Sequence, residues 1–143
     1  DRLTLVTWED HPLARGASCT FEQTLDFDFI CLFESSAIHS LLLKAAEDLG
    51  RILRFRVEVG NNFETVCRLV AAKVGIGVIP ASAAYRYARD IPIRVVPLDD
   101  AWSLRNLYLC VRDAEPLPAF AQELVDLLVS DAASAQDPVL GVA

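Results

Sequence analysis

The sequence contains no methionine among its 143 residues and begins at Asp1, so we expect it to be a segment of a longer protein. Basic residues are also few, because 13 Lys and Arg stand against 20 Asp and Glu, which gives a formal net charge of -7. Affinity for a phosphate backbone depends on basic side chains that release counterions. The composition therefore predicts that this chain itself does not bind nucleic acid.

Long apolar runs are missing as well. A bilayer span needs about 20 apolar residues in a row, and the longest apolar stretch, residues 69–84, is broken by Lys73, two glycines and a proline. The N-terminus lacks the basic and then apolar layout of a signal peptide, although a mature exported protein would lack it too. We expect no membrane span. With 53% hydrophobic and 23% charged residues, the chain is typical of a single packed globular domain.

The four cysteines form no C-x-x-C pair and have no histidine at ligand spacing. The sequence therefore predicts no metal and no cofactor, and favours a reducing compartment such as the cytoplasm. Cys31, Cys67 and Cys110 lie in apolar periodic segments, which favours small core residues over redox sensors or disulfide partners. Cys19 lies in a polar stretch and is the candidate for a reactive thiol.

Segments with strand and helix patterns alternate along the chain. Apolar or alternating runs predict strands at residues 3–7, 27–33, 55–59, 76–79, 93–98 and 106–112. Helical spacing and capping residues predict a turn at 21–25 and helices at 37–49, 63–74, 80–88 and 118–128. We expect Gly50 and Gly75 to end the second and third of these segments. This alternation is typical of the α/β class, with a mostly parallel sheet flanked by helices.

Two loops that leave strands toward helices carry short polar side chains. The first holds Ser35 and Ser36, and the second holds Asn61 and Asn62 just before Phe63. Free backbone N–H groups at a helix N-terminus attract carboxylates and phosphates. One interpretation is a binding site for a small anion at one edge of the sheet. The alternative is that these residues are ordinary helix caps.

Catalytic residues are not predicted. His11 precedes a proline in a loop, and His39 is expected on a half-exposed helix face, with no nucleophile motif near either residue. The adjacent carboxylates Asp99 and Asp100 are interpreted as part of a solvated turn. The glycines at 75 and 77 follow a helix and lead into a strand, which is the reverse of a nucleotide loop.

Four strings, taken in order, resemble the effector-binding domain of LysR-type transcriptional regulators over residues 1–129. They are LTLV at 3–6 running into HPLA at 11–14, the turn with Ser35 and Ser36, VAAKVGIGVIP at 70–80, and LDD at 98–100 followed by Arg105 and LYL at 107–109. One departure is Lys73, where the family usually has glycine. That difference predicts a less tightly turned helix end.

The resemblance implies a lobe of the periplasmic-binding-protein type 2 kind plus the remnant of a second lobe. In the family, an N-terminal winged helix-turn-helix precedes a two-lobed domain that holds an inducer between its lobes. By this likeness, residues 1–9 are a hinge strand from lobe one, 10–95 are lobe two, 96–130 return to lobe one and 131–143 are a frayed tail. The second hinge strand would be 94–98.

The function implied by the resemblance is small-molecule sensing in a bacterial LysR-type DNA-binding regulator of the cytoplasm. The inducer would be a carboxylate-bearing metabolite, and the matching residues are Ser35, Ser36, Asn61, Asn62 and Phe63. DNA would be bound only by the N-terminal part, and the full-length protein would be a dimer or tetramer without membrane partners. The alternatives are an extracytoplasmic solute-binding protein of the same fold and, less favoured, an enzyme related by fold.

Overall fold

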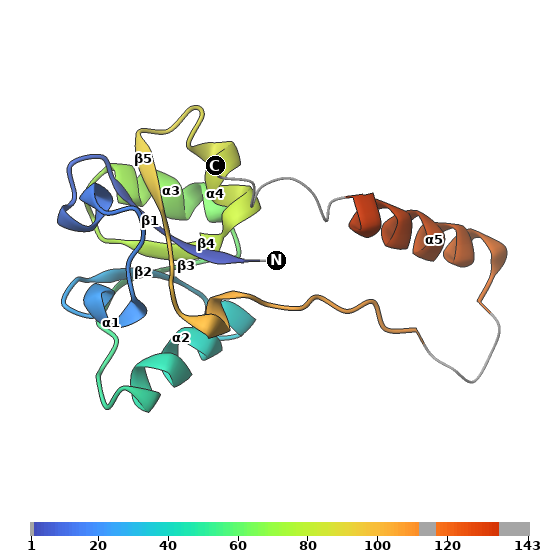
Figure 1. The fold of residues 1–143 in the computed structure, drawn as a ribbon, viewed down its shortest axis with the longest axis horizontal. Coiled ribbons are helices and arrows are strands. Elements are labelled where there is room, and N and C mark those ends of the chain that lie inside the picture. Colours follow the sequence, from blue (N-terminus) through green and yellow to red (C-terminus); the bar gives the residue numbers. More distant parts are fainter. Residues whose placement is uncertain (1, 112–116, 135–143) are drawn as a thin grey trace. The chain divides into compact units, whose positions relative to one another are not determined.

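The computed structural model describes residues 2–111 and 117–134 (Figure 1). The chain divides into two compact units, residues 1–106 and 107–143, instead of the single domain that its length suggests. The first unit holds the strands β1 (Leu3–Trp8), β2 (Phe29–Leu32), β3 (Phe55–Val59), β4 (Gly77–Pro80) and β5 (Ile93–Pro97). Its helices are α1 (Phe21–Thr24), α2 (Ala37–Asp48), α3 (Phe63–Ala71) and α4 (Ala81–Tyr87), with short 3-10 turns η1 (Pro12–Arg15) and η2 (Ala101–Ser103). The second unit holds α5 (Ala119–Ser134).

Four of the five described strands run in the same direction. Strand β1 lies between β4 and β5 and is antiparallel to both, so β4 and β5 run parallel to each other. Strand β2 pairs in parallel with β3, and Phe29 at its start bridges in parallel to Ile76 beside β4. The predicted α/β class with a mostly parallel sheet is confirmed, with β1 as the exception. Apolar alternation indicates a strand but carries no information on its direction.

The core of the first unit is centred on β1, whose Leu3, Leu5 and Val6 are fully buried. Helix α3 packs so closely on this sheet that a Cβ at Gly77 would lie 2.6 Å from Cγ1 of Val66. Only a glycine leaves room for that contact. Burying each aliphatic side chain contributes about 1.5–3 kcal/mol, so this layer holds the sheet and the helices together.

The predicted helix starts are confirmed at three places. Ser36 Oγ accepts a hydrogen bond from Ile38 N at the start of α2. Asn62 Oδ1 accepts from Thr65 N at the start of α3. Thr20 precedes α1 and donates its backbone N–H to Gln23 Oε1 at 2.9 Å. These caps depend on local sequence, which is why they could be identified without the fold.

The two helix ends differ in how well they were predicted. Gly50 ends α2 with φ +64°, as expected. Helix α3 ends earlier than expected, and its left-handed residue is Lys73 (φ 59°), not Gly75. The prediction that Lys73 loosens this helix end is therefore wrong. Gly75 is needed for another reason, because a Cβ there would lie 2.7 Å from the carbonyl oxygen of Asp28.

The predicted strand at 106–112 is absent from residues 106–111, and Arg112 lies outside the described residues. Leu107 is 74% exposed and Tyr108 is 79% exposed. A strand needs a neighbour to accept and donate its backbone hydrogen bonds, and no described strand pairs with this segment. The apolar pattern alone could not supply that neighbour.

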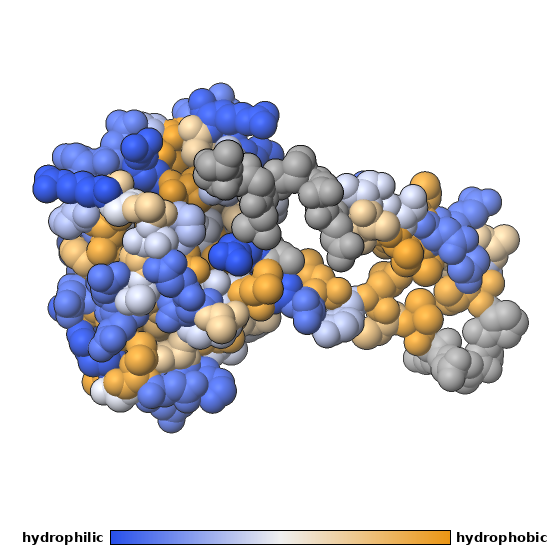
Figure 2. All heavy atoms as spheres, viewed as in Figure 1, coloured by the Kyte–Doolittle hydropathy of each residue, from blue (hydrophilic) through white to orange (hydrophobic). Residues whose placement is uncertain are grey.

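Helix α5 follows Pro118, as predicted, and the Pro118 carbonyl accepts from Ala121 N at 2.9 Å. The helix continues to Ser134, so it includes the first four residues of the expected frayed tail, whose remainder at 135–143 lies outside the described residues. None of its side chains is buried, and hydrophobic residues cover much of its visible surface (Figure 2). Neither this helix nor any other in the described ranges is long and apolar enough to cross a bilayer.

Candidate functional site

The two predicted polar loops lie next to each other in the structure. Because β2 and β3 are parallel neighbours, with Leu32 opposite Val59, both strands end at the same edge of the sheet. A Cβ added at Gly60 would lie 3.9 Å from Cε2 of Phe33, so the two loops are close to each other. The fold therefore brings the segments with the five predicted residues to one edge; these are Ser35, Ser36, Asn61, Asn62 and Phe63.

Both helix caps at this edge keep hydrogen-bond donors for another partner. Ser36 Oγ accepts from Ile38 N at 3.3 Å, which leaves its hydroxyl hydrogen as a donor. Asn62 Oδ1 accepts from Thr65 N at 3.2 Å, which leaves its side-chain NH₂ group. Donors at the positive ends of two helix dipoles suit a negatively charged group. Capping and anion binding are thus compatible at the same two residues.

The remaining predicted residues differ in exposure. Ser35 and Asn61 are exposed, and Phe63 is partly buried against the core. Phe33, expected as the last residue of a buried strand, is instead 50% exposed at this edge. The apolar run FDFICLF gave no sign that the strand ends at Leu32. Phe33 thus offers apolar surface beside the polar donors and was not predicted from the sequence as a site residue.

His39 is buried behind the first loop, so the predicted half-exposed position is wrong. Its Nδ1 lies 2.8 Å from the Leu32 carbonyl oxygen, and its ring centroid lies 4.9 Å from that of Phe55. Since a carbonyl can only accept, Nδ1 carries the proton and donates. This contact ties the first turn of α2 to the end of β2, and it positions the helix that Ser36 caps.

Two of the four cysteine predictions are wrong. Cys19 is 3% exposed, because its backbone bonds to Pro97 O and Asp99 N hold the polar loop against the end of β5. Burial, together with the negative charge of the nearby aspartates 99 and 100, raises the pKa of this thiol to about 11. It is therefore not a reactive thiol. Cys110, expected in the core, is exposed, whereas Cys31 and Cys67 are buried as predicted.

Asp99 and Asp100 anchor the loop before α1, and Asp99 is exposed, as predicted. Ser18 Oγ donates to Asp99 Oδ2 at 2.9 Å, and Phe21 N donates to Asp100 Oδ2 at 2.6 Å. Within the described ranges, no group of three or more His, Cys, Asp and Glu side chains could hold a metal ion.

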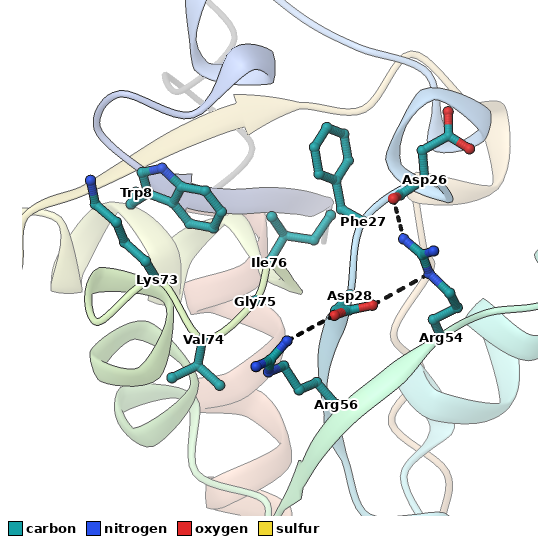
Figure 3. Close-up of a pocket in the computed structure, with 10 residues that line it drawn as sticks. All are labelled: Trp8, Asp26, Phe27, Asp28, Arg54, Arg56, Lys73, Val74, Gly75 and Ile76. Atoms are coloured by element: carbon teal, nitrogen blue, oxygen red, sulfur yellow. Dashed lines mark hydrogen bonds and ion pairs between the residues drawn. The ribbon is translucent and has the colours of Figure 1, made fainter.

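A pocket of about 290 Å³ lies at the other edge of the sheet (Figure 3). Its lining comes from Trp8 at the end of β1, from residues 26–28 before β2, from Arg54 and Arg56 around the start of β3, and from residues 73–76 before β4. Since β1 runs opposite to the others, these points all meet at the amino ends of β2, β3 and β4. The site predicted from the sequence lies at the carboxyl ends of the strands, so this pocket was not predicted.

The three-stranded sheet β4-β1-β5 and the two-stranded sheet β2-β3 are linked by the Phe29–Ile76 bridge, and two capped helices leave the second sheet at one edge. This arrangement defines the class as an α/β lobe of the periplasmic-binding-protein type 2 kind. A family model described as the LysR substrate binding domain matches residues 1–133. The chain therefore belongs to the LysR substrate-binding domain family.

Known proteins similar to this chain are transcription regulators and their effector domains. A probable RuBisCO transcriptional regulator of Emiliania huxleyi is 25% identical over 96% of this chain and 46% of its own length. The BenM effector-binding domain with its effector benzoate is similar over the whole chain and 65% of that structure (TM-score 0.77, 22% identity). The Synechocystis PCC6803 CcmR regulatory domain in complex with 2-PG is similar over 90% of this chain and 62% of that structure (TM-score 0.74, 20% identity). The chain spans less than half the length of the Emiliania huxleyi regulator.

Proposed function

We propose that this chain is the effector-sensing part of a LysR-type transcription regulator. The observation that carries this conclusion is the family match over residues 1–133. The regulator among the similar proteins is about twice the length of this chain, which fits a sensor joined to a further part. The comparisons favour a regulator over the alternative of an extracytoplasmic solute-binding protein.

The effector is a small carboxylate-bearing metabolite held at the edge where β2 and β3 end. Ser36 and Asn62 donate to its carboxylate, with Ser35 and Asn61 beside them, and Phe63 contacts its apolar part. Three observations support this site: the parallel pairing that joins the two loops, the donors that both caps retain, and the dipoles of α2 and α3. Benzoate, named with BenM, is a ligand of the same chemical kind.

Residues 10–95 form lobe two, and residues 1–9 and 96–130 belong to lobe one. Strands β1 and β5 act as the hinge. The register supports this, because Leu3 lies opposite Pro80 and Thr4 lies opposite Pro97. The start of β1 and the end of β5 therefore lie at the same edge of the sheet as the carboxyl end of β4. The exposed apolar residues of α5 find their burial in lobe one.

The mechanism is a population shift without a chemical reaction, so the protein is a regulator and not an enzyme. An effector that binds one arrangement of the lobes more tightly shifts the protein toward that arrangement. In the full-length dimer or tetramer, this changes how the subunits pack and how the N-terminal part holds DNA in the cytoplasm. The free thiols of all four cysteines support a reducing compartment.

A thermal-shift experiment on the full-length protein tests the effector site. A panel of small carboxylates that includes benzoate is screened for a compound that raises the melting temperature. Ser36→Ala and Asn62→Ala are expected to reduce that rise at least fivefold, because each removes a donor to the carboxylate. Each variant also loses a helix cap, which costs about 1 kcal/mol without ligand.

Thr20→Ala is the matched control, since it replaces the N-cap residue of α1, which is not one of the two helices that leave the effector edge. It is expected to lower the starting melting temperature but to keep the full ligand-induced rise. If Thr20→Ala reduces the rise as much as Ser36→Ala does, the polar residues are only caps and the site is wrong.

A further inference from the structure

We infer that the pocket at the amino ends of β2, β3 and β4 is a second ligand site, for a small monoanion with an apolar body. It lies at the opposite ends of the strands from the proposed effector edge, and all its lining residues belong to the first unit. Its volume of about 290 Å³ is near the lower limit of known small-molecule sites. It therefore takes a compound of about one or two rings.

One side of the pocket is apolar, and His11 packs against two of its aromatic rings. Figure 3 shows Trp8, Phe27 and Ile76 together on this side. The buried ring of His11 makes edge contacts with both aromatic residues, at centroid distances of 4.3 Å to Trp8 and 4.4 Å to Phe27. These contacts fix the two rings before any ligand arrives, so little conformational entropy is lost on binding.

The other side carries an excess of positive charge. Asp28 lies between two arginines, with Arg54 Nε 3.3 Å from its Oδ1 and an Arg56 guanidinium nitrogen 3.1 Å from its Oδ2 (Figure 3). A single carboxylate thus serves two guanidinium groups. Each guanidinium has five N–H donors, so donors remain for a second anion. The two arginines and one aspartate together carry a net charge of +1, which favours a monoanion.

The other charged residues of the lining are already paired one to one. Lys73 Nζ lies 2.9 Å from Asp10, and Asp26 accepts from Arg51 at 2.7 Å. Because these charges are already paired, an added anion has its most favourable electrostatic interaction at the Arg54–Asp28–Arg56 group. Lys73 also lies on the pocket wall in a left-handed conformation that favours glycine, so the chain keeps a cation there at a cost in backbone energy.

The turn beside Asp28 supplies the floor between the two sides. Gly75 approaches the Asp28 carbonyl so closely that a Cβ would lie 2.7 Å from the oxygen. Ile76 N donates to that same oxygen at 2.9 Å. A ligand here contacts the start of β3 and the turn before β4 together, and it leaves the carboxyl ends of the strands free.

An NMR titration of the 143-residue chain with 2-naphthoate tests the site. The chain has two tryptophans: Trp8 lines the pocket, whereas Trp102 packs against Phe21 with ring centroids 5.1 Å apart. We expect the indole N–H resonance of Trp8 to move and that of Trp102 to stay. The uncharged 2-naphthylmethanol should bind at least fivefold more weakly, since it cannot use the excess charge.

Arg56→Gln should weaken 2-naphthoate binding at least fivefold, because it leaves Asp28 with a single arginine. Arg68→Gln is the matched control, since it removes an exposed charge that pairs with Glu64 outside the lining, and it should change affinity less than twofold. Ser36→Ala should leave this titration unchanged, which separates it from the effector site. An unmoved Trp8 resonance, equal binding of the uncharged analogue, or equal losses in the two arginine variants would overturn the inference.

Discussion

His11 is fully buried between Trp8 and Phe27. Its Nδ1 accepts from Leu13 N at 3.1 Å, and in the structure as described its buried Nε2 has no hydrogen-bond partner. Burial without a partner for the charged ring lowers the pKa of His11 below its ordinary value of 6.5. Below about pH 6.5, His11 therefore binds a proton in the unfolded chain but stays neutral in the folded chain until the pH reaches its lowered pKa.

This difference predicts that acid destabilises the fold through His11. As the pH falls from 6.5 toward the lowered pKa of the folded protein, the free energy of unfolding should decrease by up to about 1.4 kcal/mol per pH unit. Urea unfolding at pH 7.5, 6.5 and 5.5 measures it. His11→Asn keeps a side-chain acceptor for Leu13 N but cannot titrate, so its pH dependence should be shallower. Equal slopes for the two proteins would contradict the assignment.

Residues with local roles were predictable, and those with distant neighbours were not. Ser36 and Asn62 are caps because of the residues that follow them within three positions. The burial of Cys19 depends on bonds to Pro97 and Asp99, about 80 residues away, which no local pattern reveals. The same holds for the pocket, whose lining is collected from four separate segments.

Helix ends offer a direct test of backbone conformation. Gly50 has φ +64°, and a Cβ there would have no atom within 4 Å, so substitution changes only the backbone energy. Gly50→Ala should lower the free energy of unfolding by about 1 kcal/mol. Lys73→Gly should raise it by a similar amount, because Lys73 holds φ 59° with a side chain. Urea unfolding of the variants measures both changes.

Lys73→Ala is the control for the lost ion pair with Asp10. It removes the ammonium group but keeps the unfavourable conformation, and exposed ion pairs contribute little to stability. It should therefore give no stabilisation. If Lys73→Gly is no more stable than Lys73→Ala, the left-handed conformation is not strained in the folded protein.

The positions of helices and strands could be predicted from periodicity in the sequence, whereas the pairing of the strands could not. The alternation in Phe55–Val59 and the helical spacing in Phe63–Ala71 were sufficient to locate β3 and α3. The antiparallel direction of β1 and the missing strand at 106–111 depend on which neighbours are present. Local sequence carries propensity, and tertiary contacts decide the hydrogen-bond partners.

On the scale of the whole molecule, the same strands carry two different edges. The carboxyl ends of β2 and β3 carry the capped helices with free donors, and the amino ends carry the arginine-lined pocket. The resemblance to the LysR family, now confirmed by the family match, assigned a function only to the first edge. The acidic balance of this chain fits our proposal that DNA contacts lie in another part of the full-length protein.

The measurement that tests the account most directly is the effector dependence of operator binding by the full-length protein, followed by fluorescence anisotropy of labelled DNA. With the carboxylate identified in the thermal-shift screen, the wild-type protein should change its DNA affinity as effector is added. The Ser36→Ala/Asn62→Ala double variant should bind DNA as the wild type does without effector, and should lose the effector response. A full effector response in the double variant, or an equal loss of effector-free DNA binding, would contradict the account.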